Sequence, residues 1–167
     1  MENIVTAMLN RLPGLAVMLA LLVPAAVHAE HPVDHLHLSP ELTRLLQQEM
    51  QAIQQGMQSL LPAIVSGNWP VVAETAARIQ HSYILQQQLT AAQLGELQQL
   101  PPAFRDLDQT FHRSAGRLAE AGRMQDADLA GFWFQRLTDG CIACHSRFAA
   151  NRFPALAAPE SSAEHHQ

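Results

Sequence analysis

Both cysteines of this 167-residue chain lie in one pentapeptide near its end, Cys141-Ile142-Ala143-Cys144-His145. A C-x-x-C-H run is the attachment site of a c-type haem. Each thiol can add to one vinyl group of the porphyrin, and the histidine that follows can bind the iron as proximal ligand. On a helix the two-residue spacer places the sulfurs about one turn apart, which suits the separation of the two vinyl groups. We therefore expect one covalent haem c on Cys141 and Cys144, with His145 on the iron.

Other uses of a C-x-x-C pair fit this sequence less well. A dithiol redox motif is expected beside a βαβ pattern, but strand-like alternation is missing here. A structural zinc site needs a second pair of ligands at finger-like spacing, and the sequence has no such pair. Covalent haem is the interpretation that the motif favours.

The first 29 residues have the pattern of a secretory signal peptide. Arg11 precedes the apolar run 12–27, and Val27-His28-Ala29 stands at the cleavage positions. This run is shorter than the roughly 20 residues that a spanning helix needs, so an uncleaved anchor is the less favoured alternative. We expect cleavage near Ala29 and a periplasmic protein, since bacteria attach haem to this motif outside the cytoplasm.

The charge pattern restricts the partners. The chain has a formal net charge of −5 at pH 7, and its basic residues are all arginines. A ring of lysines for docking onto acidic proteins is therefore excluded, and nucleic acid is not an expected partner. Periplasmic or membrane-bound redox proteins are the expected ones.

Proline and glycine divide residues 39–153 into four predicted helices, so the expected fold class is all-α. The first helix starts at Ser39-Pro40-Glu41, which combines a serine cap, a proline at the first position and an acid near the positive end of the dipole. Its apolar residues recur every three or four positions. They are Leu42, Leu46, Met50, Ile53, Met57, Leu60 and Ile64. This stripe predicts that Met50 points into the core.

Further helices are expected over 70–88, over 104–122 and from the cap Asp126 onward, with a short helical piece over 90–99. Short connections favour an antiparallel up-down-up-down four-helix bundle. The haem motif lies near the end of the fourth helix, so the cofactor should sit between helices at that end. We expect residues 30–38 to be a flexible N-terminal segment and residues 154–167 a disordered C-terminal tail.

Over about residues 40–150 the chain resembles the class II c-type cytochromes, the group that contains cytochrome c′ and its low-spin relatives. The haem motif lies close to the C-terminus, Phe148 follows His145 by three residues, and Met50 is followed by Met57 seven residues later. The resemblance implies a bundle in which the motif residues hold the haem and Phe148 borders it. It also implies that Met50 faces the sixth coordination position, and that the chain can form a homodimer.

The sequence offers three candidates for the sixth ligand, Met50, His81 and His112, of which Met50 leads by direction. An open, five-coordinate iron remains an alternative. We expect a periplasmic monohaem cytochrome that carries single electrons and is not an enzyme. The alternative is a five-coordinate haem protein that binds nitric oxide or carbon monoxide. A peroxidase is not expected, because it needs distal acid–base groups that only the two histidines could supply.

Overall fold

The computed structural model describes residues 36–157, so the predicted signal peptide and residues 158–167 lie outside the described part. Within residues 36–157 the secondary structure is entirely helical, which confirms the predicted fold class. The elements are α1 (Pro40–Val65), α2 (Trp69–Gln80), α3 (Leu85–Gln88), α4 (Ala91–Gln98), α5 (Pro102–Met124), α6 (Ala127–Phe148) and a 3-10 turn η1 (Pro154–Leu156). In this part of the chain, no helix has both the length and the hydropathy that crossing a bilayer requires.

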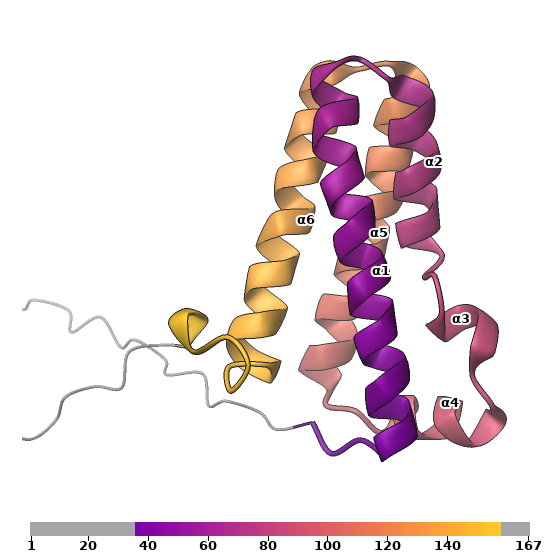
Figure 1. Ribbon diagram of the computed structural model, residues 1–167, viewed down its shortest axis with the longest axis vertical. Coiled ribbons are helices and arrows are strands. Elements are labelled where there is room, and N and C mark those ends of the chain that lie inside the picture. The colour runs from indigo at the N-terminus through magenta and orange to yellow at the C-terminus, as the bar shows by residue number, and fades with distance from the viewer. Residues whose placement is uncertain (1–35, 158–167) are drawn as a thin grey trace, which may run out of the picture.

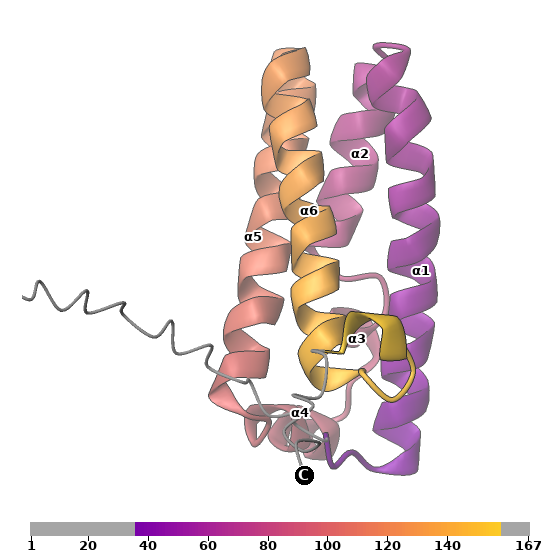
Figure 2. The ribbon, with the colours of Figure 1, turned by 90° about the vertical axis from the view of Figure 1, so that its left-hand side faces the viewer.

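The four longer helices lie side by side, and each runs in the opposite direction to the one before it (Figure 1). Helix α5 packs most extensively, against α2 on one side and α6 on the other, whereas α1 packs mainly against α2 and touches α6 lightly. The short helices α3 and α4 lie at the end of the molecule where α6 finishes (Figure 2). The motif at the end of α6 is thus placed at that same end.

The main hydrophobic core extends from the opposite end, where α1 joins α2 and α5 joins α6, to the middle of the helices. Its fully buried members are small or aliphatic: Leu60, Val72, Ala76, Ile79, Ala115, Leu118, Ala119, Ala121, Ala130 and Leu137. Small residues allow α5 to lie close to α2. A Cβ added at Gly122 would lie only 2.8 Å from the backbone nitrogen of Ala73. Close packing of this kind fixes the register of the two helices.

Several helix starts are where the sequence predicted them. The Ser39 hydroxyl accepts a hydrogen bond of 3.3 Å from the backbone N–H of Leu42 at the start of α1. Thr90 and Gln93 form a reciprocal capping box on α4, and Asp126 accepts from the N–H of Leu129 at 2.9 Å on α6. These bonds satisfy N–H groups that have no partner inside a helix.

The prediction that Met50 lies in the buried core is wrong. The buried face of α1 carries Glu49, which is 1% exposed, whereas Met50 is 40% exposed. Other buried positions on this face are Leu42, Leu45, Ile53, Gly56, Leu60 and Ala63. A buried carboxylate is tolerated only where it is well hydrogen-bonded, and Glu49 has such partners in the connection between α2 and α3.

The predicted helix over 70–88 is interrupted, which corrects a second expectation. Helix α2 ends at Gln80, and Ser82 adopts a left-handed backbone with φ 58°. The Glu49 carboxylate then accepts three backbone hydrogen bonds, from Tyr83 at 2.9 Å, Ile84 at 2.6 Å and Leu85 at 3.2 Å. These three amides are consequently bound to a side chain of α1 and not to the carbonyls of α2.

The segment that was predicted as a tail, 154–167, begins with η1, which packs against α6. Helix α5 extends two residues beyond its predicted end at Gly122, because the left-handed Gln125, with φ 57°, terminates it. The connection to α6 is accordingly tight, which holds α5 and α6 as antiparallel neighbours.

Candidate functional site

The C-x-x-C-H motif occupies the last two turns of α6. Cys141 and Cys144 are three residues apart on this helix, so they lie on the same face, and both are partly buried. His145 follows on the next position, and its carbonyl accepts a hydrogen bond of 3.1 Å from the N–H of Ala149, where the helix ends. A regular helix therefore presents the two sulfurs about one turn apart, as the sequence predicted.

The surroundings of the two thiols favour the protonated form over the thiolate. Burial raises the pKa of the Cys141 thiol. Burial, the negative charge of Asp108 and the neighbouring Cys141 together raise the pKa of Cys144 to about 11. Redox-active C-x-x-C pairs have a lowered thiol pKa, often at the start of a helix, whereas this pair lies at the end of one. The site therefore lacks the electrostatics of a dithiol oxidoreductase.

A zinc site is not supported either. Residues 36–157 contain no group of three or more His, Cys, Asp or Glu side chains that could hold a metal ion. Structural zinc is bound by four such ligands as a rule. A metal at the motif would therefore need further ligands from a cofactor, as the iron of a porphyrin has from the ring nitrogens.

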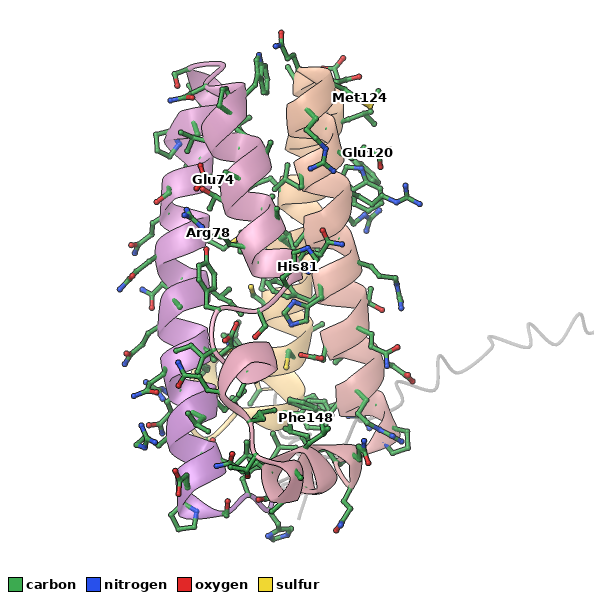
Figure 3. All side chains as sticks on the ribbon, turned by 90° about the vertical axis from the view of Figure 1, so that its right-hand side faces the viewer. Glu74, Arg78, His81, Glu120, Met124 and Phe148 are labelled. Atoms are coloured by element: carbon green, nitrogen blue, oxygen red, sulfur yellow. The ribbon has the colours of Figure 1, made fainter. Side chains whose placement is uncertain are left out.

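Aromatic side chains of α5 and α6 surround the motif. Phe148, which is 8% exposed, packs edge-to-face on Phe104 with ring centroids 5.3 Å apart. Phe111 lies beside the turn before the motif, since a Cβ added at Gly140 would be 3.3 Å from its ring. Figure 3 shows Phe148 toward the end of the molecule that α4 occupies. These rings form an apolar wall next to the two thiols.

The imidazole of His145 is available as a neutral base. Burial lowers its pKa, and the positive charge of Arg152 lowers it further. A neutral imidazole has the free lone pair that a metal ligand requires. The ring also stacks on Phe153, with centroids 4.4 Å apart and planes 13° from parallel.

The three candidate sixth ligands have different surroundings. Met50 lies on the half-exposed side of α1. His81 lies at the exposed C-terminus of α2, where it lines a shallow surface pocket of about 270 Å³ with Glu74 and Arg78 (Figure 3).

Both ring nitrogens of His112 have partners. Nδ1 lies 2.7 Å from the carbonyl oxygen of Ile79, and Nε2 lies 3.4 Å from a carboxylate oxygen of Asp108. Asp108 also raises the pKa of Cys144, so this carboxylate acts on both the histidine and the motif. His112 therefore ties α5 to the end of α2.

Sequence reasoning missed three residues that shape the site. Asp108 had a readable signal, because it precedes His112 by four residues on a helix and such pairs interact. Glu49 and Phe153 had none, because their contacts depend on how distant parts of the chain pack.

The protonation of His112 should be visible in the stability of the protein. Burial lowers its pKa, but the hydrogen bond and charge of Asp108, the Ile79 carbonyl and the charge of Glu49 outweigh this, so the pKa is raised from 6.5. A group with a raised pKa contributes fully to the stability of the fold below pH 6.5. This contribution is lost as the pH rises through the folded-state pKa. We expect the unfolding free energy of the parent to fall with rising pH through this contribution, and that of His112→Gln to show no such fall. Urea denaturation between pH 5 and 9 measures both. The exposed His37→Gln is the control, and a pH profile of His112→Gln equal to that of the parent would contradict the assignment.

None of the protein-family models, curated proteins and solved structures that were compared with this chain matches it. What the site can do chemically follows from its own residues. Two protonated thiols on one helical face, a neutral imidazole directly after them and an aromatic wall are together suited to holding a flat, apolar, iron-bearing ring.

Proposed function

We propose that the chain is an exported monohaem cytochrome that resembles the class II c-type cytochromes. Its four long helices, α1, α2, α5 and α6, would form the antiparallel up-down-up-down bundle. One haem c would be attached to Cys141 and Cys144 near the end of α6, with His145 as proximal ligand. The alternating helix directions and the position of the motif support this proposal (Figure 1).

The observation that carries the proposal is the C-x-x-C-H motif on the last two turns of α6, facing aromatic side chains of α5. The residues fit a haem. The thiols are one turn apart, His145 is held neutral by its surroundings, and Phe104 and Phe148 offer the apolar contact that a porphyrin needs. A haem bound there would supply one-electron exchange at its iron.

In the leading proposal the protein is a periplasmic carrier of single electrons and turns over no substrate. Phe104, Phe148 and the other rings of the wall would keep water from the site, which limits the rearrangement that accompanies electron transfer. The redox partners would be periplasmic or membrane-bound proteins, and a second copy of the chain is a further proposed partner. Residues 1–29 would direct export and be removed near Ala29.

A second candidate function is the binding of nitric oxide or carbon monoxide by a five-coordinate haem. The surroundings of two candidate ligands favour it: His81 is at the surface, and His112 has partners on both ring nitrogens. Ligation by Met50, which is 40% exposed, belongs to the electron-carrier proposal.

The test is to express the full chain in a bacterium that exports proteins and attaches haem, and to measure its mass and visible spectrum. We expect the mass of the processed chain plus one haem, and Met50→Ala tests whether this methionine fills the sixth position. A colourless protein with the mass of the bare polypeptide would contradict haem attachment. Loss of split α and β bands in Met50→Ala would instead show that this methionine binds the iron.

Carbon monoxide then separates the two candidate functions. Sharp α and β bands of the reduced protein that ignore the gas support the electron carrier, because its sixth position is filled. A broad high-spin spectrum that shifts when the gas is added supports the gas-binding protein.

A further inference from the structure

The chain folds back over the end of α6 after the motif. The N–H of Phe153 donates to the carbonyl of Ala149 at 3.0 Å, and the N–H of Leu156 donates to the carbonyl of Phe153 at 2.9 Å. Pro154 opens η1, which packs against α6. These bonds reverse the direction of the chain and bring the Phe153 side chain back beside His145.

The ring of Phe153 covers one face of the His145 imidazole. The two centroids are 4.4 Å apart and the planes differ by 13°, so the rings are stacked in parallel. Within residues 36–157 neither nitrogen of this imidazole has a hydrogen bond to another residue. Histidines that bind metals are usually oriented by a hydrogen bond from their second nitrogen. Here the contact that the imidazole makes is the stacked phenyl ring.

We infer that Phe153 is a positioning residue for His145, and this inference rests on the proposed function. The phenyl ring holds the plane of the imidazole in one orientation and keeps water from the covered face. Phe153 lies eight residues beyond the motif, in a turn that the motif does not specify. Its role is therefore separate from attachment of the haem, which requires only the two thiols.

Loss of the phenyl ring has a defined consequence for the iron. Without the stacked ring the imidazole plane can turn until its second N–H, which lies in that plane, donates a hydrogen bond to water, and this bond makes the ligand more basic. A more basic ligand favours the oxidised iron. We expect Phe153→Ala to lower the ratio of reduced to oxidised protein, at a fixed solution potential, by about threefold, in line with the modest strength of one aromatic pair.

The experiment uses the full exported chain and four variants. Phe153→Ala and Phe153→Leu remove the flat ring, Phe153→Tyr keeps it, and Phe132→Leu removes a half-exposed ring elsewhere on α6 as the matched control. The readouts are the reduction midpoint, followed by absorbance, and the iron–imidazole stretching frequency of the reduced protein. The mass of each variant reports whether haem is attached.

A shift of both readouts in Phe153→Ala and Phe153→Leu, with Phe153→Tyr and Phe132→Leu like the parent, supports the inference. If every variant carries haem and Phe153→Leu equals the parent in both readouts, the positioning role is wrong while the proposed function stands. If the parent itself carries no haem, the proposed function fails and the inference fails with it. Since Phe153→Leu keeps apolar bulk in the turn, its comparison with Phe153→Tyr decides the question even where Phe153→Ala does not fold.

Discussion

Glu49→Ala is expected to lower the free energy of unfolding by about 3–5 kcal/mol, as measured for the removal of one partner from a buried charged interaction. Glu49 is 1% exposed and accepts hydrogen bonds from three successive backbone N–H groups, at residues 83–85. Alanine would leave the amides of Tyr83 and Ile84 without this acceptor, whereas Leu85 would keep its bond to the Ser82 hydroxyl, and the connection between α2 and α3 would be released from α1. Urea denaturation of the full chain, followed by circular dichroism, measures the change.

Met50→Ala is the matched control, because the neighbouring side chain on the same helix is 40% exposed. A substitution at such a position changes stability by about 1 kcal/mol or less. Glu49→Gln, which keeps one acceptor oxygen but loses the charge, should fall between the two. If Met50→Ala proves more destabilising than Glu49→Ala, α1 is rotated as its apolar stripe predicted, and the inward position of Glu49 is wrong.

The double change Cys141→Ser and Cys144→Ser is expected to remove covalent haem completely. A serine hydroxyl does not form the thioether that links each cysteine to a vinyl group, and these are the only two cysteines in the chain. Each single variant should retain one link, and so keep its pigment through extraction with acidified organic solvent. Mass spectrometry of the exported proteins gives the haem content directly.

Ala143→Ser is the control for this experiment, since it places the same hydroxyl side chain at an exposed position inside the motif. It should retain haem like the parent. Pigment that stays bound to the double variant through solvent extraction would show a covalent link elsewhere on the protein. Loss of pigment in Ala143→Ser would show that any change in this turn prevents attachment.

Parts of this structure could be predicted from the sequence because the interactions that produce them are local. Ser39, Thr90 and Asp126 each bond to an amide only three residues ahead, so a short window of sequence contains both partners. The C-x-x-C-H motif is equally local, because its two thiols and its imidazole are placed by one turn of one helix.

Other parts depended on contacts between residues that are far apart in the chain. The apolar pattern of α1 could not distinguish Met50 from Glu49 as the inward residue, because the partners of Glu49 are 34 to 36 positions away. The same bonds interrupt the predicted helix over 70–88. The sequence offered His112 as an iron ligand, whereas the fold places its Nδ1 against the carbonyl of Ile79, 33 positions away.

The sequence by itself determined the helical class, the helix starts and the residues suited to hold a haem, since each depends on side chains within one turn of each other. Tertiary structure alone decided which side of α1 is buried, where α2 ends and which ring covers His145. A buried polar group is stable only with partners that the folded chain brings to it. For Glu49 those partners are the amides of residues 83–85, and no stretch of sequence around position 49 contains them.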